Sequence, residues 1–391
     1  MKIDQDIYIY KEHIRNLRRD LHLIPEPGFD LHKTADYVAR ELDHLGIAYE
    51  KGIAQTGLVA VIPGKTRGNA IAYRSDMDAL TLTEETGLDF SSTHEGCMHG
   101  CGHDGHMATL LTFAKWVKER EDQLERDVVL IFQPAEEGPG GAEPMIEAGV
   151  LSKNDVKEIY GLHLYPEVAE GKLAVKPGPM MAKPGEFDIV VTGKSGHGAQ
   201  PHNCIDPIVI ASQLVVAFQS IVSRNLKPLI PAVITVGTIS GGERRNIIAE
   251  SVRLEGTIRA FEEETFTMLY DRMTDICIGF ERAYNCTIDR DFRGMYAPVY
   301  NDPDLTEAFH TANQVSGDVV ESIDPQMIAE DFALFQKEVP GVFFYVGTYN
   351  EEKGHTVPLH NVKFNFDEET LLNGVQAYVN VLRHRGGLAN G

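Results

Sequence analysis

The sequence predicts an α/β protein: a mainly parallel sheet with helices on both faces, interrupted by a smaller α+β module. Two observations lead to this class. In the first half of the chain, segments with helical periodicity alternate with short apolar runs, a pattern typical of parallel sheets covered by helices. Near residue 183 the alternation gives way to longer β runs and two long helices, and after residue 296 it returns.

The periodicity also places the individual elements. The first part is expected to hold helices over 9–23 and 33–45 and strands over 58–63, 70–74, 128–133 and 158–163. The middle part is expected to hold strands over 187–192, 232–239 and 252–260 and helices over 207–225 and 263–284. A strand over 342–347 and a helix over 367–382 complete the chain. We therefore predict a main domain over 1–182 and 297–391, with an inserted domain over 183–296.

Composition excludes several classes of protein. The chain has 391 residues, enough for two domains, and 58 acidic against 36 basic residues, a formal charge of -22 that argues against nucleic-acid binding. Five cysteines without a paired framework and an N-terminus without a signal-peptide pattern favour a cytoplasmic protein. The most apolar stretch, 207–222, is too short to span a bilayer and is expected to be a core or interface helix.

A metal site is indicated by the segment from His94 to His106, which holds four histidines and two cysteines. Thiolate and imidazole are common ligands of zinc and its neighbours, and the four glycines between them let the chain bend. There are two alternative interpretations of this segment: the histidines are ordinary surface or core residues, or the segment forms a closed structural zinc site. No second pair of closely spaced cysteines exists to complete a structural site, so further ligands must come from elsewhere.

Candidate ligands follow three apolar runs. The run 127–133 leads into Glu136 and Glu137, and these neighbours can serve one site only if the backbone leaves β geometry there. One could then bind a metal while the other acts as general base; the alternative is an exposed acidic turn. His163 ends another run and His360 lies before the last helix. Either histidine alone is more often a core or loop residue, but strand ends are where open α/β sheets build sites.

These motifs together resemble the di-metal amidohydrolases, a family that includes aminoacylase, hippurate hydrolase, auxin-conjugate hydrolases and N-acetyldiaminopimelate deacetylase. The resemblance covers nearly the whole chain. It rests on the segments Arg74-Ser-Asp-Met-Asp-Ala-Leu80, Cys101-Gly-His-Asp-Gly-His106, Gln133-Pro-Ala-Glu-Glu-Gly-Pro-Gly-Gly-Ala142, Ser195-Gly-His-Gly-Ala-Gln-Pro-His202, Glu255-Gly-Thr-Ile-Arg259 and Ala329-Glu-Asp-Phe332.

The resemblance implies a role for each matching residue. Two divalent metal ions (zinc, manganese, cobalt or nickel) would be held by Cys101, His103, Glu137, His163 and His360. Glu136 would be the catalytic base, and one of Asp76 and Asp78 would assist it. Substrate binding would fall to His197, Asn246 and Arg259.

The resemblance further implies hydrolysis of the amide of a small N-acyl amino acid. In relatives the inserted domain is a lid that also forms a homodimer, so we expect a homodimer here, with no nucleic-acid or membrane partner. Two alternatives stay open at this level: a broad N-acyl amino acid or hippurate-type amidohydrolase, and a non-catalytic metal-binding protein on the same fold. An additional thiol, Cys97, is expected to be an ordinary loop cysteine.

Overall fold

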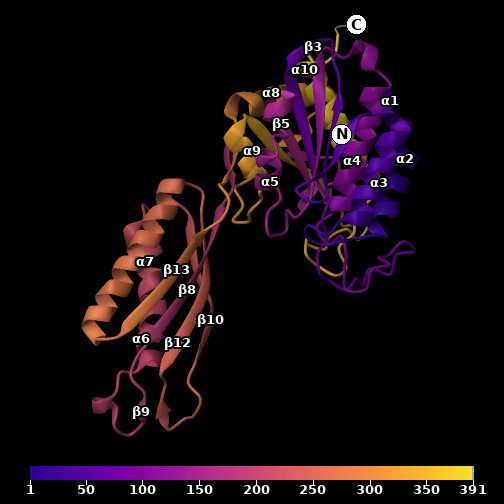
Figure 1. The fold of residues 1–391 in the computed structure, drawn as a ribbon. Helices are drawn as coiled ribbons and strands as arrows, with labels where there is room; N and C mark the ends of the chain where they lie inside the picture. The colour runs from indigo at the N-terminus through magenta and orange to yellow at the C-terminus, as the bar shows by residue number, and fades with distance from the viewer. Residues whose placement is uncertain (390–391) are drawn as a thin grey trace. The chain divides into compact units, whose positions relative to one another are not determined.

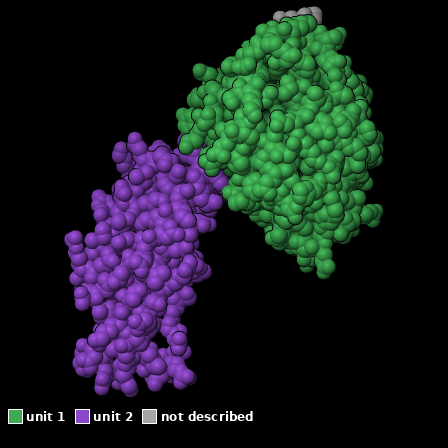
Figure 2. Space-filling model, viewed as in Figure 1, with its two compact units in different colours: residues 1–178, 300–324, 331–391 green, residues 179–299, 325–330 purple. Residues whose placement is uncertain are grey.

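The computed structural model describes residues 1–389 and consists of two compact units. Unit 1 comprises residues 1–178, 300–324 and 331 onward, and unit 2 comprises residues 179–299 and 325–330 (Figure 2). Each unit has its own apolar core. The predicted fold class is confirmed.

Unit 1 is built on an eight-stranded sheet (Figure 1). In spatial order its strands are β1 (Tyr49–Ile53), β2 (Gly57–Ile62), β4 (Arg126–Gln133), β3 (Thr66–Asp76), β5 (Val156–Ala169), β16 (Gly341–Tyr349), β6 (Leu173–Ala174) and β15 (Val320–Glu321). The four central strands, β4, β3, β5 and β16, are parallel. Strand β1 pairs antiparallel with β2, β2 with β4, and β6 with β16, whereas the edge strand β15 pairs parallel with β6. The carboxyl ends of the central strands therefore share one edge.

Helices cover both faces of this sheet. One face carries α1 (Gln5–Tyr8), α2 (Lys11–His22), α3 (His32–Leu45), α4 (His103–Lys118), α8 (Pro303–Asn313) and α10 (Leu371–His384). The other carries α5 (Ala142–Glu147) and α9 (Phe332–Glu338). Successive residues of β16 show the alternation: Phe344 packs on Phe309 of α8, with ring centroids 4.5 Å apart, and Phe343 packs on Phe332 of α9, at 5.1 Å.

Unit 2 is an antiparallel sheet with two helices. Its strands, in spatial order, are β10 (Ala232–Gly241), β12 (Ser251–Ala260), β8 (Lys183–Thr192) and β13 (Thr287–Gly294). The helices are α6 (Pro207–Ser220), extended by a π-helical segment over Ile221–Asn225, and α7 (Glu263–Tyr284). A short pair joins β9 (Gly196–His197) to β11 (Ile247–Ile248), and a second joins β7 (Gly178–Met181) to β14 (Val299–Asn301).

The structure also holds elements that the sequence did not predict, among them β1, β13, α4 and α8. Helix α4 was not predicted, because it is buried on nearly all sides and so lacks the apolar and polar faces that reveal a helix. With its π-helical extension, the helix at Pro207–Asn225 has 19 residues and is long and apolar enough to cross a membrane, contrary to the prediction from the shorter run. This is weak evidence for a span, since Ile210, Leu214 and Phe218 are buried in the core of unit 2.

Candidate metal centre

The candidate site lies in unit 1 at the carboxyl ends of three neighbouring parallel strands. Asp76 of β3 is in register with Gln133 of β4. Arg74 pairs with Gly161 of β5, so His163, two residues further along, reaches the same level as Asp76. Open α/β sheets bind ligands at this edge, and the register brings segments distant in sequence together there.

The loop after β4 turns both glutamates toward one place. Ala135 has φ of 56°, a left-handed conformation that is rare for a residue with a side chain, so the backbone leaves β geometry directly before Glu136. Asp78 stabilises the turn with both carboxylate oxygens, which accept the N–H groups of Glu136 (2.9 Å) and Glu137 (3.0 Å). The condition that the sequence analysis set for two neighbouring glutamates is thus met.

Two histidines use Nδ1 for a backbone hydrogen bond and keep Nε2 as the candidate metal ligand. His103 donates its Nδ1–H to the backbone carbonyl of Asp78 (2.8 Å), and His163 donates its Nδ1–H to the carbonyl of Leu164 (2.7 Å). A hydrogen bond at one ring nitrogen fixes which nitrogen keeps its hydrogen, so the other nitrogen is the one that can bind a metal. His106 differs, because its Nδ1 donates to Asp76 and its Nε2 accepts the N–H of Leu164, so both nitrogens are used.

The predicted ligands form two groups that share Cys101. One consists of Cys101, His103 and His163, and the other of Cys101, Glu137 and His360; within each, the ligand atoms all lie within 4.8 Å of one another. The thiol sulfur lies 3.3 Å from Nε2 of both His163 and His360. Oε1 of Glu137 lies 3.1 Å from Nε2 of His360. Each group could hold one divalent ion, and Cys101 would be available to both.

The two groups differ in their exposure. The Cys101–His103–His163 group is buried, whereas the side chain of His360 is 54% exposed. The second group is therefore the one that solvent and a substrate can reach. Nε2 of His103 is buried without a hydrogen-bond partner among the described residues, which is costly for a polar atom and is what an ion in the centre would relieve.

The pKa values of the predicted ligands indicate which of them must lose a proton when a metal binds. Burial, together with Glu137 and Glu136, raises the pKa of the Cys101 thiol well above its usual value, and burial next to His106 holds the pKa of His163 well below it. Burial lowers the pKa of His103, but Asp76 and Asp78 outweigh it and raise the value to about 10. Metal binding must therefore displace protons from Cys101 and His103.

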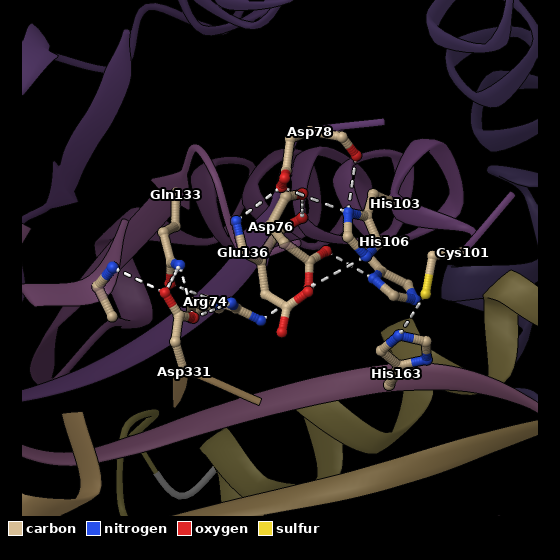
Figure 3. Close-up of polar contacts among 12 residues, drawn as sticks. Arg74, Asp76, Asp78, Cys101, His103, His106, Gln133, Glu136, His163 and Asp331 are labelled. Atoms are coloured by element: carbon tan, nitrogen blue, oxygen red, sulfur yellow. Dashed lines mark hydrogen bonds and ion pairs between the residues drawn. The ribbon is translucent and has the colours of Figure 1, made fainter. Parts of the chain in front are cut away.

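A buried charged hub supports this centre (Figure 3). Arg74 is fully buried and donates to Gln133 (2.9 Å), Asp76 (2.7 Å) and Asp331 (3.1 Å). Asp331 also accepts the side-chain amide of Gln133 (2.7 Å) and the backbone N–H groups of Gly141 (2.9 Å) and residue 142 (3.0 Å). One carboxylate thus holds both ends of the loop 133–142, which carries Glu136 and Glu137.

We expect Asp331→Asn to destabilise unit 1 by about 3 kcal/mol, because it removes a buried partner of Arg74 and places an amide donor against other donors. Urea denaturation followed by circular dichroism measures the change. Asp302→Asn is the matched control: Asp302 caps α8 by accepting the N–H of Leu305, and asparagine caps equally well, so its effect should stay within about 0.5 kcal/mol. Equal stability of both variants would show that Asp331 does not hold the loop.

The residues predicted to bind substrate lie in unit 2, and the structure brings only two of them together. His197 in β9 faces Ile247 in β11, directly after Asn246. Arg259 lies at the other end of the sheet, opposite Pro184, while the far end of β8 is Thr192. Eight residues of extended chain separate these positions, about 26 Å, so His197 and Arg259 of one chain cannot share a small substrate within unit 2.

Three buried residues of the site, Arg74, His106 and Asp331, were not predicted to have a role, although all three lie in the motifs that carry the family resemblance. A signal was present at Arg74, because an arginine at the end of an apolar run predicts a buried ion pair. Its partner Asp331 is 257 positions away, and only the fold identifies it.

Comparison with known proteins agrees with this geometry. The family described as peptidase family M20/M25/M40 matches residues 72–384. The chain belongs to this family. A solved structure of a proposed aminohydrolase from methicillin-resistant Staphylococcus aureus is 35% identical, with a TM-score of 0.92 over 98% of both chains. The YXEP protein of Bacillus subtilis, described as a dinuclear metal-binding peptidase of the M20 family, is 32% identical, with a TM-score of 0.84 over 96% of this chain and 98% of that one.

A more distant solved structure shares the fold. The aminobenzoyl-glutamate utilization protein of Klebsiella pneumoniae is 21% identical, with a TM-score of 0.69 over 97% of this chain and 98% of that chain. Family membership and the two ligand groups together establish a metal-dependent amidohydrolase or peptidase of the M20 type that uses two divalent metal ions.

Proposed function

We propose that the protein removes the acetyl group from N-acetyl-L,L-diaminopimelate, releasing acetate and L,L-diaminopimelate for lysine biosynthesis in the cytoplasm. The reaction class is carried by one observation, the position of Glu136 beside two groups of metal ligands. The substrate is supported by segments that resemble N-acetyldiaminopimelate deacetylases, among them Ser223-Arg-Asn225 and Asn246-Ile-Ile-Ala-Glu250.

Glu136 carries the proton transfers of the proposed reaction. Bound divalent ions lower the pKa of water and polarise a carbonyl oxygen. The carboxylate of Glu136 accepts a proton from the attacking water, whose oxygen bonds to the amide carbon. As the carbon–nitrogen bond breaks, Glu136 passes that proton to the leaving nitrogen. A carboxylate fixed by its own backbone N–H to Asp78 can remain within reach of both atoms.

Asp76 and Asp78 have different roles in this proposal because they contact different residues. Asp78 is the assisting residue, because it holds the backbone of both glutamates and its carboxylate lies 3.6 Å from Nδ1 of His103. Asp76 acts through other residues, binding His106 and Arg74. His106 in turn accepts the N–H of Leu164, next to the ligand His163, so Asp76 orients one ligand indirectly.

We further propose that His197 and Asn246 act in the site of a second copy. The chain passes from unit 1 into unit 2 at residue 179, which we call the crossing point. Strand β8 then runs for ten residues toward the β9–β11 pair, so His197 lies far from the crossing point. Ala199 N–H donates to Nδ1 of His197 (3.0 Å), which leaves the hydrogen on Nε2 to stabilise an oxyanion. Arg259, half-buried near the crossing, would bind the substrate α-carboxylate.

Unit 2 also offers a surface for such a homodimer. Strand β10 is an edge strand with exposed Val233 and Ile239, and α6 exposes Ile208, Val209 and Val216. Unpaired edge strands with apolar side chains are ready to pair with a second copy.

Mixing two inactive variants tests this arrangement. Glu136→Gln and His197→Ala should each be nearly inactive alone, because each removes one half of every site. After dissociation and reassociation, half of the dimers combine the two chains and carry one intact site each, so activity should return to about a quarter of the wild-type value. Mixtures that stay inactive although the dimer has exchanged subunits would show that His197 acts within its own chain.

The substrate is tested by acetate release from N-acetyl-L,L-diaminopimelate with metal-reconstituted enzyme, next to hippurate and N-acetylmethionine and with a chelator-treated control. We expect a clear preference for the diaminopimelate derivative that chelation abolishes. Cleavage only of the other amides would assign a broad N-acyl amino acid hydrolase with the same mechanism. Absence of any cleavage would contradict the catalytic assignment.

A further inference from the structure

We propose that Arg244 and Arg245 bind the distal carboxylate of a dicarboxylic substrate, the one at the end that carries no acyl group. This inference rests on the proposed function, because it concerns the site to which His197 and Asn246 contribute. It names a determinant of substrate class that the catalytic residues do not provide.

The two arginines belong to the same turn as Asn246. The N–H of Ile247 donates to the carbonyl of Arg244 (3.2 Å) and closes the turn over residues 244–247. The carbonyl of Asn246 accepts the N–H of Gly198 (2.9 Å), the residue after His197. A Cβ on Gly198 would lie 3.1 Å from that carbonyl oxygen, so the two backbones pack closely. Any substrate held by His197 and Asn246 therefore lies next to this turn.

Both guanidinium groups are exposed and without an ion-pair or hydrogen-bond partner among residues 1–389. Two exposed arginines of the same sheet do have acidic partners: Arg253 contacts Glu255 (2.8 Å), and Arg293 contacts Asp188 (2.8 Å). The two adjacent positive charges of Arg244 and Arg245 repel each other. The chain has 22 more acidic than basic residues, so carboxylates that could neutralise these arginines are plentiful. The unpaired pair is suited to an anion that comes from outside the chain.

The chemistry of L,L-diaminopimelate fits such a site. Its acylated end is occupied by the amide and the adjacent α-carboxylate, and its other end is a free α-amino acid with its own carboxylate. Because the overall charge of the protein repels anions, that carboxylate needs a local cation, and an arginine fork binds it through two hydrogen bonds. Glu243 is exposed in the same loop, and its negative charge could bind the ammonium group at the distal end of the substrate.

The test compares two substrates that differ only in this group. Nα-acetyl-L-lysine is N-acetyl-L,L-diaminopimelate without the distal carboxylate. In the double variant Arg244→Ala/Arg245→Ala, kcat/KM should fall about 10- to 100-fold for the diaminopimelate derivative and less than about twofold for the lysine derivative. Equal losses on both substrates, or no loss on the first, would overturn the proposal.

Arg272→Ala is the matched control. Arg272 is also an exposed arginine of unit 2, but it lies in the middle of α7, where its ion-pair partner is Asp275 of the same helix (3.4 Å). It should leave both kcat/KM values unchanged. Sedimentation of the double variant should show the oligomeric state of the wild type, so that a loss of assembly cannot mimic the result.

Calorimetric binding of L,L-diaminopimelate and L-lysine to the metal-reconstituted protein separates this inference from the proposed function. Tighter binding of L,L-diaminopimelate by the wild type, lost in the double variant, would support the arginine site even if the acetylated compound is not cleaved. Equal affinity of the wild type for both amino acids would overturn it. Absence of hydrolysis alone counts against the proposed function only.

Discussion

Glu136→Gln is expected to lower kcat by about 10³- to 10⁴-fold while both metal ions stay bound. Glutamine has the same shape but cannot accept the proton of the attacking water. The turn should persist, because Asp78 holds it through the backbone N–H of residue 136, which the substitution leaves in place. KM should change by no more than about threefold, since the substrate is bound by other residues.

Steady-state kinetics with metal analysis by mass spectrometry of the same preparation measures this effect. Glu143→Gln provides the control, because Glu143 is an exposed carboxylate on α5, just after the same loop, and its loss should leave kcat unchanged. Turnover of the Glu136 variant within tenfold of the wild type would remove Glu136 as the general base. A parallel loss of metal would instead make it a ligand.

Cys101→Ala is expected to remove both ions and with them all measurable hydrolysis. Its sulfur lies 3.3 Å from a histidine nitrogen of each ligand group, so one substitution opens both groups. His360→Ala removes a ligand from the exposed group alone and should keep about one ion per chain. Metal content per chain after gel filtration distinguishes the two variants.

The neighbouring thiol provides the control for this second prediction. Cys97 is also buried and lies four residues before Cys101, but it belongs to neither ligand group among the described residues. Cys97→Ala should keep two ions per chain. One remaining ion in Cys101→Ala would show that the thiolate serves a single ion, and full occupancy would show that it is not a ligand.

Much of the site could be predicted because many of its functional residues lie in short segments of the sequence. Cys101 and His103 lie in one short segment, Glu136 and Glu137 follow one apolar run, and His163 ends another. Residue types that bind metals at strand ends point to a metal site without any knowledge of their distances. The same local patterns placed the four central strands of unit 1 and the two long helices of unit 2, α6 and α7, and failed at α4, where uniform burial removes the periodic signal.

The sequence by itself indicated a metal site and an inserted module through residue type and periodicity, and its resemblance to a known family implied the reaction class and the metal ligands to be tested. Only the tertiary structure decided which groups share Cys101, why His106 has no nitrogen left for a metal, and that Asp331 holds the loop of Glu136. It also separated His197 from Arg259 within one chain. The physical reason is that hydrogen bonds and ion pairs act over a few ångströms, and residues up to 259 positions apart in the chain meet at that range only once it has folded.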